Sequence, residues 1–205
     1  MTDPCSFNLP HVFSYRGWSI RYLTRQGDET PTLQKHWVVF VHGTPWSSSV
    51  FRPMSDALYA TGRLNIMLYD LAGYGQSQNF SGQGSSEPDA SVKTQGEALA
   101  ALLDHLQLSG RNGSTQPHIV AHDIAGVISL RAHLLHECEY RSLCLLDTNC
   151  VLPWGDTLYK LVRSDFHVFE QLPVGVFEGA LRAIIQSALY RYRESNQGLI
   201  WQKKT

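Results

Sequence analysis

The stretch from residue 118 to residue 126, with the sequence HIVAHDIAG, limits the possible folds more than any other part of the chain. Its apolar first half is typical of a buried strand, and its second half is typical of the first turn of a helix. Asp123 therefore stands at a sharp reversal, where the small residues Ala121, Ala125 and Gly126 let the two backbones approach closely. Two interpretations fit this stretch alone: a reactive carboxylate exposed at the end of the strand, or an aspartate that caps the helix, since Asp is a preferred N-cap residue.

Composition excludes several classes of protein. With 205 residues, of which 43% are hydrophobic and 17% charged, the chain is long enough for one substantial core. Its net charge of −1 gives no field that would attract nucleic acid or an anionic membrane, so we expect neither partner. The four cysteines are spaced too irregularly for a disulfide framework or a zinc site. The chain starts without a basic and apolar leader and has no apolar run of about 18 residues, which predicts a cytoplasmic protein.

Apolar runs alternate with amphipathic stretches over the first three quarters of the chain. Residues 12–15 and 18–23 predict a hairpin at one sheet edge. The run at 37–41 has no polar alternation, which is typical of a parallel strand buried on both faces. Further strands are expected at 66–69 and 142–146, and helices at 49–59, 95–108, 124–135, 157–169 and 174–192. This rhythm predicts an α/β fold with a mostly parallel, doubly wound sheet at 1–150, followed by a helical segment at 151–205.

Two loops follow predicted strands. In the first, HGTP at 42–45, Gly43 permits close backbone approach and the bond between Thr44 and Pro45 can be cis. In the second, DLAGYGQS at 70–77, we expect Asp70 to hold the glycine turn by bonding its own following backbone.

These loops, together with AHDIAG at 121–126, resemble three motifs of the α/β-hydrolase superfamily in the same order. More narrowly, they resemble the branch with an aspartate nucleophile, which includes soluble epoxide hydrolases and haloalkane dehalogenases. The resemblance covers roughly residues 10–195. It implies that 1–150 form strands one to six of the hydrolase core and that 151–205 begin a helical cap.

The resemblance implies covalent catalysis on a small-molecule substrate, without a cofactor or metal. Asp123 would attack an electrophilic carbon and form an ester, which a histidine-activated water then hydrolyses. The N–H groups of Thr44 and Ile124 would form the oxyanion hole. Relatives usually carry Trp where this chain has Ile124, and haloalkane dehalogenases usually carry Asn where it has Thr44. An epoxide or another strained or ester-like electrophile is therefore expected rather than a halide.

In the family, the catalytic histidine follows the eighth strand, and none of the nine histidines lies after a late strand. His42, with Gly43 and Pro45, and His122 are expected to be structural around the site. Asp147, at the end of the 142–146 strand, is a candidate supporting acid or a plain strand-end aspartate. Cap tyrosines that could polarise an epoxide are Tyr159, Tyr190 and Tyr192.

We therefore expect a C-terminally truncated chain that is weakly active or inactive, with an open edge at its last strand through which it self-associates. The alternative is a non-catalytic α/β-hydrolase-like protein that binds a small molecule or a protein in the same cleft. A metal site at His133, His136 and Cys138 is disfavoured, because the cysteine lies on a different helical face from the two histidines.

Overall fold

The computed structural model describes residues 7–27, 35–82, 87–151 and 157–187. The chain divides into two compact units, Met1–Leu152 and Pro153–Thr205, and each is described by itself.

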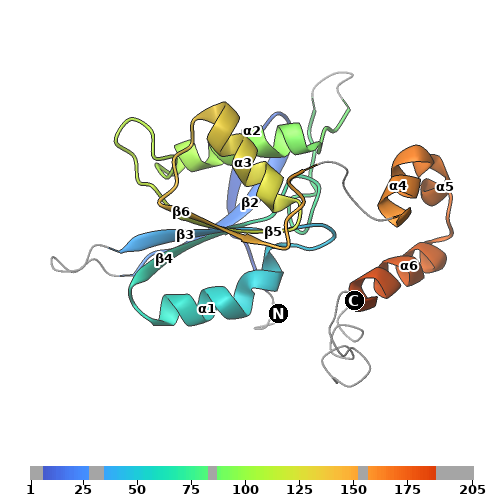
Figure 1. Cartoon of the computed structure of the whole chain (residues 1–205), viewed down its shortest axis with the longest axis horizontal. Helices are drawn as coiled ribbons and strands as arrows, with labels where there is room; N and C mark the ends of the chain where they lie inside the picture. The colour runs from blue at the N-terminus through green and yellow to red at the C-terminus, as the bar shows by residue number, and fades with distance from the viewer. Residues whose placement is uncertain (1–6, 28–34, 83–86, 152–156, 188–205) are drawn as a thin grey trace. The chain divides into compact units, whose positions relative to one another are not determined.

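The first unit is built on a six-stranded sheet in the order β1-β2-β4-β3-β5-β6 (Figure 1). Its strands are β1 His11–Tyr15, β2 Trp18–Arg25, β3 His36–Val41, β4 Leu64–Tyr69, β5 His118–His122 and β6 Ser142–Leu146. The first two strands form the predicted antiparallel hairpin at one edge, and β2 is antiparallel to β4. The other four strands run parallel to one another. The predicted α/β class with a mostly parallel sheet is confirmed.

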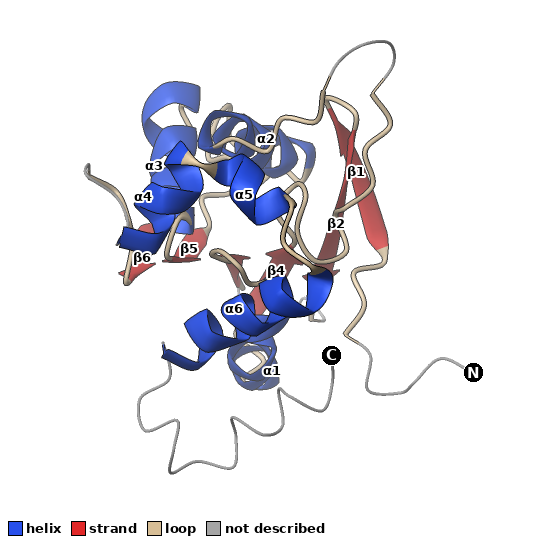
Figure 2. Cartoon of the chain, turned by 90° about the vertical axis from the view of Figure 1, so that its right-hand side faces the viewer, coloured by secondary structure: helices blue, strands red, loops and turns tan. Residues whose placement is uncertain are grey.

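Helices cover both faces of this sheet. The helical elements of the unit are η1 Ser48–Phe51, α1 Arg52–Ala60, α2 Val92–His105 and α3 Ala125–His136. Figures 1 and 2 show α2 and α3 side by side on one face and α1 on the other. The sheet is therefore wound on both sides, as the alternation of strands and helices predicts.

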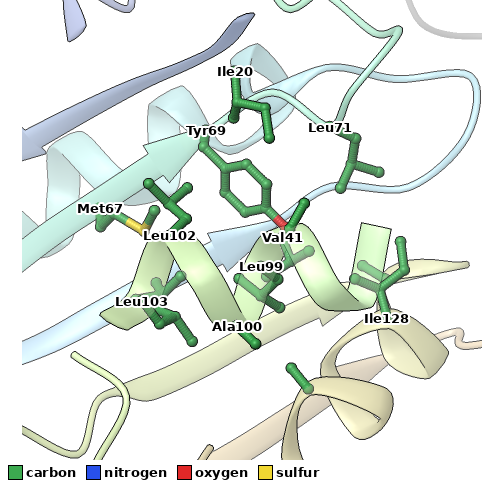
Figure 3. Close-up of a cluster of buried hydrophobic side chains, with 14 of the residues drawn as sticks. Ile20, Val41, Met67, Tyr69, Leu71, Leu99, Ala100, Leu102, Leu103 and Ile128 are labelled. Carbon is green, nitrogen blue, oxygen red and sulfur yellow. The ribbon is translucent and has the colours of Figure 1, made fainter. Parts of the chain in front are cut away.

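The sequence of β3 explains how two cores are built from one strand. Val39 and Val41 point into the larger apolar cluster, together with residues of α2 such as Leu99 (Figure 3). Val38 and Phe40 point into the smaller cluster on the other face. Because side chains alternate along a strand, an unbroken apolar run is what burial on both faces requires.

The helix α2 begins three residues earlier than the predicted start at Gln95. The reason is a cap, because the Ser91 hydroxyl accepts a hydrogen bond from the Thr94 N–H at 3.3 Å. The helix also ends before the predicted Leu108, at His105, since Gln107 has a φ of +57°.

The second unit contains the helices α4 Thr157–Ser164, α5 Phe166–Glu170 and α6 Val174–Ser187. The prediction of one helix over 157–169 is wrong, because Asp165, with φ −135° and ψ 43°, interrupts it. The end of the helix predicted over 174–192 lies outside the described residues. None of the helices in the described segments has the length and apolar character needed to cross a bilayer.

Candidate active site

Asp123 lies at the turn between β5 and α3, as the sequence predicts. Its φ of +56° is a left-handed conformation that non-glycine residues rarely adopt. Ala121 and Ala125 are fully buried on either side of the turn. A Cβ on Gly126 would lie 2.5 Å from the Cβ of Thr148, so only glycine fits where α3 passes the loop after β6. The small residues thus hold the Asp123 side chain at the carboxyl end of the parallel strands.

Both carboxylate oxygens of Asp123 accept hydrogen bonds. The Thr44 N–H donates to Oδ2 at 2.8 Å, and the Asn149 side-chain amide donates to Oδ1 at 2.7 Å. The residue that caps α3 is Ile124, without a side-chain cap bond. The interpretation of Asp123 as a simple helix cap is therefore wrong, because its carboxylate binds two loops and not the helix.

The HGTP loop reaches Asp123 because Gly43 has no side chain. A Cβ at this glycine would lie 2.5 Å from the Cβ of Asp123 and 2.8 Å from its Oδ2. The bond between Thr44 and Pro45 is cis, as the sequence permits. The N–H of Ile124, the second predicted oxyanion donor, has no acceptor among the hydrogen bonds of the described residues.

His42 joins this loop to the end of β4. Its Nδ1 donates to the Gly43 carbonyl at 3.0 Å, and its Nε2 accepts from the Leu71 N–H at 2.9 Å. Burial lowers the pKa of His42 below its ordinary value of 6.5, although the Gly43 bond and the Asp70 carboxylate oppose this shift. Asp70 lies 3.9 Å from Nε2, but the Leu71 N–H occupies that nitrogen. A neutral ring with both nitrogens engaged has no free position for activating water.

Asp70 holds the glycine turn, as predicted, and also the start of η1. Its Oδ2 accepts from the Gln76 N–H at 2.7 Å. Its Oδ1 accepts from the N–H and the hydroxyl of Ser48, at 2.7 and 2.6 Å. The same turn places Tyr74 next to the site, where its hydroxyl lies 3.1 Å from the Thr44 hydroxyl.

The other predicted site residues do not contact the Asp123 carboxylate. Asp147 is exposed with a φ of +44°, and its side chain has no hydrogen bond in the described parts of the chain. All nine histidines, His122 included, lie in those parts, and none forms a hydrogen bond or ion pair with Asp123. Tyr159 belongs to α4 in the second unit, and Tyr190 and Tyr192 lie outside the described residues.

Sequence reasoning missed Asn149. The signal for it was available, because parallel strands present their carboxyl ends at the same edge of a sheet, and β5 and β6 are parallel neighbours. A polar side chain just after β6 was therefore placed to reach the residue that follows β5. The sequence prediction named Asp147, at the end of the same strand, instead of Asn149.

No group of three or more metal-binding side chains occurs in the described segments. The Nδ1 of His133 is engaged with the Cys138 carbonyl at 2.7 Å. Burial raises the pKa of the Cys138 thiol to about 11, which disfavours the thiolate that a metal needs.

The strand order and the turn after β5 that carries Asp123 define an α/β-hydrolase fold. Residues 38–199 match the model of the alpha/beta hydrolase family, and the chain belongs to this family. Among solved structures, it is similar to an alpha/beta hydrolase fold protein from Burkholderia ambifaria, with 30% identity, a TM-score of 0.72, and coverage of 89% of this chain and 60% of that one.

Two more distant structures share the fold. A thermophilic esterase from Thermogutta terrifontis is 18% identical with a TM-score of 0.60, over 84% of this chain and 54% of the esterase. A haloalkane dehalogenase from Agrobacterium tumefaciens is 21% identical with a TM-score of 0.50, over 67% of this chain and 40% of the dehalogenase. The chain thus spans between 40% and 60% of the length of these three proteins. The comparison with curated proteins found no match.

Proposed function

We propose that Asp123 is a nucleophile that forms an ester with a small organic electrophile. The observation that carries this proposal is the carboxylate itself, which lies on a left-handed turn with the Thr44 N–H at 2.8 Å from Oδ2. A backbone donor at this oxygen is suited to an acyl oxyanion, because it is already oriented before charge develops. A structural aspartate at a helix start would instead bond the helix N–H groups.

The chemistry proceeds in two steps. In the first, Oδ1 attacks a carbon of the substrate, so that a carbon–oxygen bond forms and the bond to the leaving group breaks with its electron pair. With an epoxide, the leaving oxygen remains attached to the product and takes up a proton. In the second step, water attacks the Asp123 carbonyl carbon, and negative charge develops on Oδ2 next to the N–H groups of Thr44 and Ile124. The bond between that carbon and Oδ1 then breaks, so that Oδ1 leaves with the product as a hydroxyl and takes up a proton from the water, whose oxygen completes the new carboxylate.

An epoxide or a related oxygen electrophile fits the site better than a halide. The hydroxyls of Thr44 and Tyr74 form a pair 3.1 Å apart, and the N–H of the same threonine bonds the nucleophile. Hydroxyl donors stabilise a developing alkoxide by hydrogen bonds. The similarity to the haloalkane dehalogenase, at 21% identity, concerns the fold and does not argue for a halide.

A second candidate function is non-catalytic binding of a small molecule or protein at the same site. It is favoured by one observation, that no histidine forms a hydrogen bond or ion pair with Asp123 in the described parts of the chain. A binding protein needs no base, whereas turnover of the ester requires one.

Labelling with a reactive haloketone separates the two functions. We expect the probe to alkylate Asp123, located by mass spectrometry of peptides, and the adduct to disappear in Asp123→Asn. Asp56→Asn is the matched control, because Asp56 is an exposed carboxylate on α1 and its loss should leave the label unchanged. Label on Cys144 or Cys150, with Asp123 unmodified in a folded chain, would favour the binding protein.

A further inference from the structure

The end of β6 and the loop after it hold Asp123 at three of its atoms. The Asp123 N–H donates to the Leu146 carbonyl at 3.1 Å, and the Asn149 N–H donates to the Asp123 carbonyl at 3.3 Å. The third bond joins the Asn149 side-chain amide to Oδ1 at 2.7 Å. Two of the three bonds come from one residue, which binds both the backbone and the side chain of Asp123.

The Asn149 side-chain bond restricts rotation of the Asp123 carboxylate about its terminal torsion, which the other contacts leave free. The terminal torsion of an aspartate is broad and roughly two-fold, so its two oxygens exchange places easily. The Thr44 N–H alone could donate to either oxygen. A second donor on the opposite side of the carboxylate fixes the plane of the group and distinguishes Oδ1 from Oδ2.

We propose that Asn149 is a positioning residue that selects Oδ1 as the attacking atom of Asp123. This inference rests on the proposed function, since it assigns a role within the same reaction. With Oδ1 as the attacking atom, Oδ2 remains beside the rigid backbone donor of Thr44 and becomes the oxyanion in the second step. With the opposite choice, the oxyanion would depend on the exposed Asn149 side chain.

The choice of an amide has a chemical reason. An Asn donates an N–H without carrying charge, so it orients the carboxylate without forming an ion pair that would have to break during attack. An Asp at the same position would have nearly the same shape, but it would place a second carboxylate against Oδ1 and oppose its negative charge.

Kinetic labelling with the haloketone tests this role in the full chain. The rate of adduct formation on Asp123 is measured against probe concentration, which gives a maximal rate and a half-saturating concentration. We expect Asn149→Ala to lower the maximal rate about tenfold, through loss of a charge-assisted hydrogen bond. Asn149→Asp should lower it further, by about a hundredfold. The half-saturating concentration should stay within about twofold, because positioning acts on the reacting state.

Matched controls are Asn79→Ala and Asn79→Asp, since Asn79 is exposed on a loop outside the site. Both should label at the parental rate. Asn149→Gln keeps the amide and should recover part of the rate lost in Asn149→Ala. Thermal unfolding midpoints of the variants show whether the chain still folds.

Each remaining outcome decides against the inference. Parental rates in Asn149→Ala, or a changed half-saturating concentration with an unchanged maximal rate, would overturn the positioning role and leave the nucleophile standing. Unfolding of all three Asn149 variants would assign the residue a structural role instead. A parent chain that is never labelled on Asp123 would overturn both the proposed function and this inference.

Discussion

At the scale of single residues, the site depends on the close approach of the HGTP loop to the Asp123 turn, at Gly43. Any side chain there would enter the space of Asp123, with a Cβ 2.5 Å from the aspartate Cβ. We predict that Gly43→Ala displaces the HGTP loop, shifts the Asp123 carboxylate from its position and lowers its labelling rate by about 10², as for misplacement of a reacting group. The measurement is the haloketone labelling rate.

The control for this prediction is Gly179→Ala. Gly179 lies in α6, where an added Cβ meets nothing within 4 Å, so the substitution should leave the labelling rate unchanged. Equal labelling of the Gly43→Ala and parent chains would show that the loop does not position the nucleophile.

His42 makes stability depend on pH. Burial of the ring lowers the folded-state pKa of His42 below 6.5, the ordinary value that holds in the unfolded chain. At a pH between the folded-state and unfolded-state pKa, the unfolded chain therefore binds a proton that the folded chain does not. Stability from this group is complete above pH 6.5 and is lost as the pH falls below it. The loss is at most about 1.4 kcal/mol per pH unit. Burial also lowers the pKa of His118, which acts in the same direction.

Urea unfolding between pH 7 and pH 5 measures this effect. We predict that the free energy of unfolding falls on acidification in the parent chain and that it falls less steeply in His42→Gln. A steeper fall in the variant, or a parent chain that gains stability on acidification, would contradict the buried neutral state of His42.

At the scale of elements, β6 is an edge strand of the sheet with exposed apolar side chains. It pairs only with β5 among the described strands, and Leu145 is 42% exposed. Leu134 and Leu135 on α3 are also exposed, at 70% and 59%. An apolar edge strand with unpaired backbone groups is a template for pairing with another chain.

We therefore predict that the 205-residue chain self-associates through β6. In size-exclusion chromatography under reducing conditions, the parent should elute as a dimer or larger species, and Leu145→Lys should shift it toward the monomer. The same substitution on the opposite edge strand, Val12→Lys on β1, should change nothing. A parent chain that remains monomeric at high concentration would refute the prediction.

The strands were predictable because apolar runs report burial directly, and β3 and β6 lie within one residue of their expected bounds. Helix ends were less predictable, since they depend on single caps and left-handed residues such as Ser91 and Gln107. Asp123 was predictable because the steric demands of its turn select small neighbours. That a polar residue after β6 faces Asp123 follows from the parallel pairing of β5 and β6, but which residue of that loop makes the contact does not, because a loop path carries no periodic signal.

At the scale of the whole molecule, the chain belongs to the alpha/beta hydrolase family but spans 60% of the Burkholderia ambifaria protein. The proposed nucleophile Asp123 and the proposed oxyanion donor, the Thr44 N–H, lie in the described residues, while none of the nine histidines forms a hydrogen bond or ion pair with Asp123. Among the described residues, the site thus has the groups proposed for ester formation, but no histidine bonded to Asp123 that could act as the base for ester hydrolysis. General base catalysis contributes about 10² to 10⁴ in rate, so ester hydrolysis without a base should be slower by about that factor than hydrolysis with one.

The most direct test of the central claim, an ester on Asp123, is a time course with a simple aryl epoxide. Diol release per chain and the intact mass of the protein are measured together, and the adduct is located by peptide mass spectrometry. We predict at most about one equivalent of product, with the added mass of the epoxide accumulating on Asp123 and absent from Asp123→Ala. Sustained turnover abolished by Asp123→Ala would show that a histidine of this chain serves as the base. A folded chain that never gains the mass of the epoxide on Asp123, and releases no diol, would contradict the aspartyl-ester account.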